Sequence, residues 1–143
     1  MIELRKISDE NFEECIQLNP NVSIEEYVDS VSYSLAEAWI YYTDTIPLAI
    51  YSEENLVGFV SMYVGDSHYQ IINFLIDSKF QNKGLGQSAA RKCLIYLKNN
   101  YDAKVVSLPV FQKNVEAIKF WQKIGFEFSE NIEDGYIWMR KNM

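Results

Sequence analysis

The feature that most constrains the fold is a change of pattern near the middle of the chain. Residues 46–51, 56–64 and 69–76 have the β-branched and aromatic composition of strands, and short polar turns separate them. This pattern predicts three consecutive antiparallel strands. After a loop, the chain continues into an amphipathic helix at about 85–99 and an apolar strand at 105–110. A strand–helix–strand unit joins parallel strands, so 69–76 and 105–110 should lie parallel.

The flanking segments are expected to complete one mixed sheet. No internal repeat, low-complexity tract or Pro/Gly/Ser-rich linker interrupts residues 1–143, which are therefore expected to form a single domain. The predicted fold class is α+β, with a mostly antiparallel sheet flanked by helices. Pro109 cannot donate to a strand ladder, which predicts an edge, a bulge or a splayed strand there. The other expected elements are a strand at 2–7, a helix capped by Ser8 or Asp9, a helix capped by Ser23 that ends before Thr43, a helix at 114–123, and a hairpin of 126–132 and 136–140 around Asp134-Gly135.

The acidic balance of the chain narrows the class of partner. Asp and Glu number 20 against 13 Lys and Arg, which gives a formal net charge of −7. Nucleic-acid binding needs basic side chains gathered on one face, so no nucleic-acid partner is expected. The same balance favours a cationic substrate through long-range attraction. An acidic surface that only maintains solubility is the open alternative.

Few residues are suited to metal or redox chemistry. Cys15 and Cys93 are the only cysteines and His68 is the only histidine, which is too few for a typical structural zinc site. No metal is therefore expected. Unbridged cysteines suit a reducing compartment. Neither a signal-peptide pattern nor an apolar run of bilayer length is found, so a cytoplasmic location without a membrane partner is expected.

The loop at 77–88 has the strongest chemical signal. It leaves a strand and enters a helix, whose first N–H groups lack internal partners and are aligned with the positive end of the helix dipole. Gly84 and Gly86 let the backbone approach an anion, and Lys83 adds a positive charge. The spacing does not match a P-loop, and the third glycine of a dinucleotide fingerprint is replaced by Ala89. We interpret the loop as a pyrophosphate site, with a purely structural tight turn as the alternative.

Two motifs in this part of the chain resemble the GNAT superfamily of acetyl-CoA-dependent N-acetyltransferases. The pattern Q-x-x-G-x-G at 81–86, after F-L-I-D at 74–77, is similar to the superfamily's acetyl-CoA signature. The pattern N-x-x-A-I-x-x-W-x-K-x-G-F at 114–126 resembles its later helix and the strand that follows. The two motifs cover roughly 69–126, and the order of elements extends the likeness to the whole chain.

This resemblance implies acetyl-CoA as cosubstrate and assigns roles to particular residues. The fourth and fifth strands would splay apart to admit the pantetheine arm, which would pair with the backbone of Phe74, Leu75 and Ile76 as an added strand does. Asn114 would hydrogen-bond near the arm and Phe120 would pack against the cosubstrate, with ordinary core packing as the alternative for Phe120. The pyrophosphate would be held by amides from Gln81, Asn82, Lys83, Gly84, Leu85, Gly86 and Gln87.

The implied reaction is direct attack of an amine on the acetyl thioester. A backbone N–H of Leu75 or Ile76 would stabilise the oxyanion. Many members of the superfamily protonate the leaving thiolate with a Tyr where this chain has Trp121, and an indole N–H can donate a hydrogen bond but is no practical acid. Water or Tyr136 are the alternatives for that step.

The acceptor amine is predicted from a narrower resemblance. The segments 27–30, 34–38, 47–51 and 57–59 look like bacterial spermine/spermidine acetyltransferases. A polyamine would suit an acidic chain, and Glu26, Asp29 and Asn73 are its candidate contacts, with a solvated helix face as the alternative for the two carboxylates. A protein amino-terminal or lysine acetyltransferase and a non-catalytic acyl-CoA sensor are alternative functions. Dimers are common in the superfamily, so a homodimer is a further open alternative.

Overall fold

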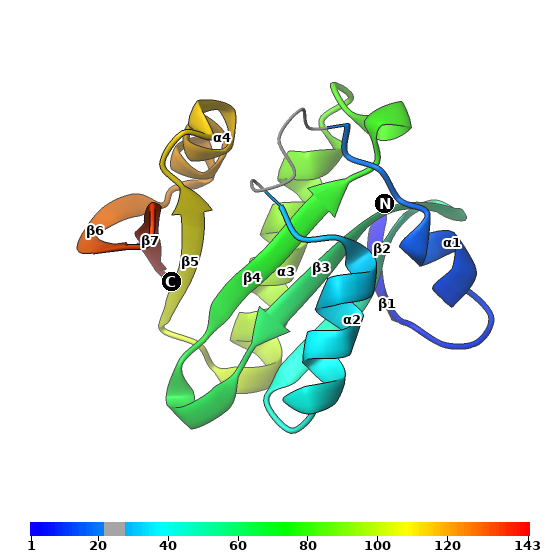
Figure 1. Ribbon diagram of the computed structural model, residues 1–143, viewed down its shortest axis with the longest axis horizontal. Coiled ribbons are helices and arrows are strands. Elements are labelled where there is room, and N and C mark those ends of the chain that lie inside the picture. Colours follow the sequence, from blue (N-terminus) through cyan, green and yellow to red (C-terminus); the bar gives the residue numbers. More distant parts are fainter. Residues whose placement is uncertain (22–27) are drawn as a thin grey trace.

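A computed structural model describes residues 1–21 and 28–143. They form one seven-stranded sheet with the strand order β1-β2-β3-β4-β5-β7-β6, and helices lie on both faces (Figure 1). The elements are β1 (Ile2–Lys6), α1 (Phe12–Ile16), α2 (Val31–Ile40), β2 (Thr45–Ser52), β3 (Asn55–Tyr63), η2 (Gly65–Ser67), β4 (Gln70–Ile76), η3 (Ser78–Phe80), α3 (Leu85–Tyr101), β5 (Val105–Phe111), α4 (Val115–Ile124), β6 (Glu127–Glu133) and β7 (Tyr136–Asn142).

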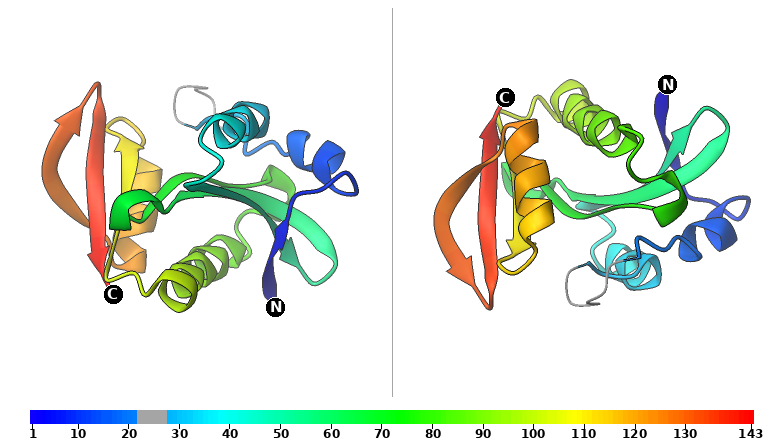
Figure 2. Two further views of the ribbon diagram at one scale, coloured as in Figure 1. Left: turned by 90° about the horizontal axis from the view of Figure 1, so that it is seen from below. Right: turned by 90° about the horizontal axis from the view of Figure 1, so that it is seen from above.

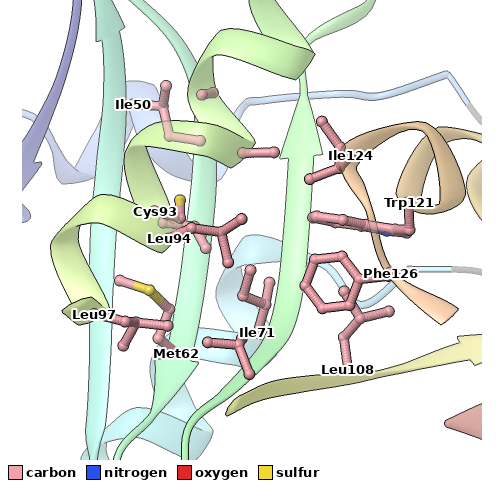
Figure 3. Close-up of a cluster of buried hydrophobic side chains, with 14 of the residues drawn as sticks. Ile50, Met62, Ile71, Cys93, Leu94, Leu97, Leu108, Trp121, Ile124 and Phe126 are labelled. Carbon is pink, nitrogen blue, oxygen red and sulfur yellow. The ribbon is translucent and has the colours of Figure 1, made fainter. Parts of the chain in front are cut away.

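The sheet separates two layers of helix. Helix α3 covers one face, and α1 and α2 cover the other, as the views from above and below make clear (Figure 2). The larger apolar core lies on the α3 side and extends to α4, where Trp121 and Phe126 meet the sheet (Figure 3). A smaller core around Phe59 and Leu75 lies under α1 and α2. The expected α+β architecture is confirmed.

Helix α3 forms because its apolar residues recur at helical spacing. Ala89, Cys93 and Leu97 are buried on one face, and Cys93 and Leu97 lie close to Met62 of the sheet (Figure 3). The helix ends where Asp102 adopts a left-handed conformation, with φ of 54°. This packing anchors α3, so the position of its first turn at the loop is determined by the core.

Strands β4 and β5 are parallel, as predicted, and they separate soon after they meet. Their pairing is limited to Gln70 opposite Ser107, and the Ser107 amide donates to the carbonyl oxygen of Tyr69 over 2.9 Å. Backbone amides two residues apart point to the same side of a strand. A backbone N–H at position 109 would therefore point towards β4. Pro109 has no N–H, so it cannot donate a hydrogen bond to that strand. Figure 1 shows the two strands diverging beyond this point.

The start of the second helix differs from the expectation. Helix α2 begins at Val31, and the Ser30 hydroxyl caps it by accepting from the Tyr33 amide over 3.1 Å. Asp29 therefore precedes the helix instead of lying on its face. The predicted cap, Ser23, lies outside the described residues. Ser23 and Ser30 both precede the apolar residues of this helix. Serine is favoured at an N-cap, so the sequence alone does not choose between the two.

The first helix is also capped differently. We expected Ser8 or Asp9 at its N-cap, but α1 begins after Asn11. The Ser8 hydroxyl instead accepts from the Glu10 amide over 3.2 Å, while Asn11 Oδ1 accepts from the Ser8 amide over 2.9 Å. Ser8 thus stabilises the turn before the helix. The prediction was wrong because a serine hydroxyl can either cap a helix or accept a bond from a nearby amide within a turn.

One buried hydroxyl yields a test of the core. Ser61 is fully buried on β3, and its Oγ has no hydrogen-bond partner within the described part of the chain. An unpaired buried hydroxyl is unfavourable, so Ser61→Ala should raise the free energy of unfolding by about 1 kcal/mol. Ser34→Ala is a matched comparison and should lower it by about 1 kcal/mol, because Ser34 Oγ accepts a bond from Asn73. Urea unfolding measures both, and a less stable Ser61→Ala protein would contradict the prediction.

The two cysteines should be chemically silent in the folded protein. Cys15 and Cys93 are both fully buried. Burial raises the pKa of the Cys15 thiol to about 11 and that of the Cys93 thiol to about 12. Thiolate is the reactive form, so neither should react with an aromatic disulfide reagent until the protein is unfolded in guanidinium, when both should. Rapid reaction of one thiol in the folded protein would show that its helix opens.

Candidate active site

A cleft of about 790 Å³ lies between the end of β4, the first turn of α3 and the first turn of α4. The motif at 74–86 includes the end of β4 and the start of α3, and the motif at 114–126 includes α4. The predicted residues that line it are Phe74, Leu75, Ile76, Gln81, Asn82, Gly84, Gly86, Gln87, Asn114, Phe120 and Trp121. The lining residues that sequence reasoning missed are Pro20, Asn21, Val28, Lys113, Val115, Glu116 and Ala117.

The loop before α3 presents free amides to this cleft. Asn82 and Gly84 both have left-handed backbones, with φ of 62° and 77°. The first bond into the helix runs from the Ser88 amide to the Gly84 carbonyl, at 3.3 Å. Among the described residues, the amides from Asn82 to Gln87 have no hydrogen-bond partner. Free donors at the positive end of a helix dipole make an anion site.

Two of the predicted phosphate-loop residues do not line the cleft with their side chains. The Leu85 side chain packs against the larger apolar core, and this contact anchors the first turn of α3. The Lys83 ammonium lies 5.8 Å from the centre of the Phe80 ring, close enough for a weak cation–π contact. Their amides belong to the free set, so both residues contribute through the backbone.

The side chain of Gln81 holds the loop in place. Its Nε2 donates to the carbonyl oxygens of Pro20 and Ile76, both over 2.9 Å. The buried Asp77 carboxylate accepts from the Asn19 amide over 3.0 Å. The amino-terminal segment is thus tied to the loop after β4. Sequence reasoning missed this role because Pro20 and Asn19 lie about sixty residues from Gln81 and Asp77 in the sequence.

The separated edge of β4 offers alternate backbone groups. The Asp77 amide donates to the Val57 carbonyl, so residues at odd positions here direct their amides towards β3. The amides of Phe74 and Ile76 therefore point into the gap between β4 and β5. The Leu75 amide points to β3 instead. Of the two predicted oxyanion donors, Ile76 has the suitable direction and Leu75 does not.

An aromatic wall closes the cleft on the α4 side. The Trp121 ring packs edge-to-face against Phe74, Phe120 and Phe126, with centroids 4.9 to 5.3 Å apart. Trp121 is only 7% exposed, and within the described residues its indole N–H has no hydrogen bond. A Cβ built on Gly86 would lie 3.3 Å from the Phe120 ring. Gly86 therefore permits the close approach of α3 and α4.

A second, acidic hollow of about 370 Å³ lies on the other side of the separated strands. Asp29 and Glu37 line it from the α2 side, and Glu133 and Asp134 line it from the tip of the β6–β7 hairpin. Partial burial of its carboxylate raises the pKa of Asp29, although the residue as a whole is exposed. Burial, and then the neighbouring Asp29 charge, raise the pKa of Glu37. Four carboxylates around one hollow give it a negative charge, which favours a cation over an anion.

Of the three predicted acceptor contacts, two are found at this hollow. Asp29 and Asn73 both line it, whereas Glu26 lies outside the described residues. Tyr136, the alternative proton donor, lies in the wall with Trp138. Sequence reasoning missed Glu37, Glu133 and Asp134, because the fold alone brings these segments together.

A small hollow of about 80 Å³, here called the connecting hollow, shares lining residues with both larger ones. It lies where β4 and β5 separate. It shares Phe74 and Trp121 with the cleft, and Asn73 and Pro109 with the acidic hollow. The cleft and the acidic hollow therefore adjoin this small hollow from opposite sides. The described residues contain no group of three or more His, Cys, Asp or Glu that could hold a metal ion, and no helix among them could cross a membrane.

Comparisons with known proteins agree with this geometry. Residues 3–126 match the acetyltransferase (GNAT) family. A spermine/spermidine N(1)-acetyltransferase from Bacillus subtilis is 29% identical, in an alignment that covers 92% of this chain and 91% of the relative.

Solved structures share the fold. A PaiA N-acetyltransferase from Thermoplasma acidophilum, in complex with coenzyme A, superposes with a TM-score of 0.75 at 19% identity, covering 100% of this chain and 99% of that one. A spermidine N-acetyltransferase from Vibrio cholerae, in complex with CoA and spermine, has a TM-score of 0.75 at 19% identity, covering 99% and 95%.

The chain therefore belongs to the acetyltransferase (GNAT) family. It is an acyltransferase enzyme that takes its acetyl group from acetyl-CoA. The free amides and the separated β4 edge suit the pyrophosphate and the pantetheine arm of that molecule.

Proposed function

We propose that this enzyme transfers an acetyl group from acetyl-CoA to a primary amine of a polyamine such as spermine or spermidine. The observation that carries the proposal is the acidic hollow, which is joined through the separated strands to the cofactor cleft. A polyamine has several ammonium groups at neutral pH, since aliphatic amines have pKa values near 10.4. Carboxylates on opposite walls can hold those that do not react, while one end reaches the connecting hollow.

In the proposed complex, the chain acts mainly by positioning two substrates. Bound acetyl-CoA supplies the acetyl thioester. The amides of residues 82–87 hold its pyrophosphate, and the exposed edge of β4 pairs with its arm. The Ile76 amide points to where the carbonyl oxygen gains charge. The amine nitrogen forms the C–N bond as the C–S bond breaks, in a single complex of enzyme and both substrates.

Two proton transfers complete the proposed reaction. The ammonium must lose one proton to become a neutral amine, and the nitrogen loses a second proton after it attacks. The carboxylates of Asp29 and Glu37 line the hollow that it would enter and could take up these protons or pass them to water. The thiolate of coenzyme A leaves with a pKa close to the ordinary thiol value of about 8.5, so it needs no strong acid. The Trp121 indole N–H has no other partner in the described chain and can donate a hydrogen bond to the departing sulfur.

The amino-acid likeness supports the same acceptor. The Bacillus subtilis relative is a spermine/spermidine acetyltransferase, and the similarity spans nine-tenths of both chains. Its identity of 29% is too low to transfer a substrate by itself. The acidic hollow provides independent support, because its charge comes from residues of this chain.

The decisive experiment is a panel of acceptors. Release of thiol from acetyl-CoA would be followed with spermine, spermidine, short diamines, amino acids and peptides, and the buried cysteines should add no background. We expect turnover with spermine and spermidine far above that with monoamines. Turnover with peptides alone would favour a protein acetyltransferase. Tight acetyl-CoA binding without turnover on any amine would favour an acyl-CoA sensor, for which Trp121 in place of Tyr is the supporting observation.

A further inference from the structure

Asn73 lies at the junction between the donor and acceptor sides of the site. It is on β4, next to Phe74, and is only 7% exposed. It lines both the connecting hollow and the acidic hollow. Its side chain faces α2, on the same side of the sheet as its cross-strand neighbour Ser61. A buried amide at this position is costly unless its polar atoms have partners.

The orientation of the Asn73 amide is determined by its hydrogen bonds. Nδ2 donates to the backbone carbonyl oxygen of Asp29 over 3.0 Å and to Ser34 Oγ over 2.9 Å. A carbonyl oxygen can only accept, so the nitrogen must face Asp29 and the reverse orientation would bring two oxygens together. Both amide hydrogens are thereby used. Oδ1 has no partner within the described residues and is not sealed from the hollows.

We propose that Asn73 Oδ1 accepts a hydrogen bond from the attacking amine and positions its nitrogen at the connecting hollow. This inference rests on the proposed function and deepens it. A neutral primary amine has two N–H bonds and one lone pair. When one N–H is held by a rigid acceptor on β4, the lone pair can be directed along the strand gap towards the thioester. Asn73 is thus a substrate-positioning residue.

The chemistry of an amide oxygen defines what Asn73 does not do. It cannot take up a proton at physiological pH, so it is not the base. It is also uncharged, so it favours an ammonium less strongly than a carboxylate would and leaves the reacting nitrogen easier to deprotonate. The two tasks are divided: carboxylates hold the charged, unreactive ends of the polyamine, and Asn73 holds the neutral, reactive one.

The test compares Asn73→Ala with Ser61→Ala. Ser61 is buried directly across from Asn73 and has no assigned part in the reaction. Misplacing a reacting group by about 1 Å can cost roughly 100-fold, so Asn73→Ala should reduce kcat with spermidine by roughly that factor. The Kd for acetyl-CoA and the slow hydrolysis of acetyl-CoA without amine should stay unchanged. Ser61→Ala should keep kcat within about threefold, since it alters no group at the junction.

Each other outcome has a distinct meaning. Full kcat in Asn73→Ala, with a wild-type protein that acetylates spermidine, would overturn the positioning role and leave the proposed function intact. A parallel loss of acetyl-CoA affinity, amine-independent hydrolysis and thermal stability would also overturn it, because Asn73 would then only brace β4 against α2. A wild-type protein that acetylates no amine would refute the proposed function itself.

Discussion

Neutralising Asp29 and Glu37 together, as Asp29→Asn with Glu37→Gln, should lower kcat/KM for spermine by roughly 100-fold. A hydrogen bond to a charged group contributes about 1.5–3 kcal/mol. Losing one such bond at each of the two carboxylates, at the low end of this range, already corresponds to a factor of roughly 100. Both side chains line the acidic hollow beside Asn73. Steady-state kinetics with spermine and with a monoamine would measure the effect, which should be much smaller for the monoamine.

A charge-matched control separates the hollow from the general field of the protein. Glu127→Gln with Glu130→Gln also removes two negative charges, but from exposed positions on β6 that do not line the hollow. This variant should keep kcat/KM within about threefold, because exposed charges beyond a Debye length of about 8 Å are largely screened at physiological salt. Equal losses in both double variants would show that net charge alone attracts the amine, and would contradict a specific acceptor site.

The same two carboxylates predict how activity and stability depend on pH. The pKa of each is raised by burial, so on acidification each loses its charge at a higher pH than an ordinary carboxylate does. Affinity for the polyamine should fall in that window. For stability the sign is opposite, because the folded state binds the protons more tightly. The free energy of unfolding decreases as pH rises from the ordinary to the raised pKa values. The neutral double variant should therefore be at least as stable as the wild type at pH 7.

Replacing Gln87 by Pro should weaken acetyl-CoA binding roughly 10- to 100-fold, the cost of one hydrogen bond of about 1.5–3 kcal/mol to a charged group. Gln87 is in the first turn of α3, where its amide has no partner within the helix. Proline is tolerated in a first helical turn, so the substitution removes a donor from the cleft and leaves the helix in place.

Gln87→Ala is the matched control, because it removes the side chain and keeps the N–H. Calorimetric titration should give a Kd for acetyl-CoA within about threefold of the wild type for this variant, as expected for a surface change that breaks no contact. Equal weakening by Ala and Pro would show that the glutamine side chain holds the ligand. Unchanged binding by both would contradict the assignment of the pyrophosphate to the amides of residues 82–87.

The order of the elements could be predicted because it depends on local patterns. The strand-like composition of β2, β3 and β4, and the helical spacing of Ala89, Cys93 and Leu97, are readable in single segments. Pro109 predicted an edge, a bulge or a splayed strand, and the structure has the last of these. The start of α2 was missed, because Ser23 and Ser30 are both residues that favour an N-cap, and the sequence alone does not show that Ser30 caps this helix. The turn around Ser8 was missed for a similar reason.

The two halves of the site differ in how far sequence reasoning could reach. The pyrophosphate loop is continuous in sequence, and its glycines and helix start lie side by side. The acidic hollow is assembled from α2 and the β6–β7 hairpin, about a hundred residues apart, so Glu133 and Asp134 gave no local signal. Gln81 was predicted to offer its amide to the pyrophosphate, but that amide donates to the Ser78 carbonyl over 3.4 Å. Its side-chain bonds to Pro20 and Ile76 depend on the folded arrangement.

The most direct test of the central claim is a stoichiometry. Enzyme, acetyl-CoA and spermidine would be incubated together, with free thiol followed optically and the products identified by mass spectrometry. The account predicts one N-acetylated spermidine, modified at a terminal nitrogen, for each coenzyme A released, and little thiol without the amine. Thiol release at the same rate with and without spermidine, or none in either case despite acetyl-CoA binding, would contradict it.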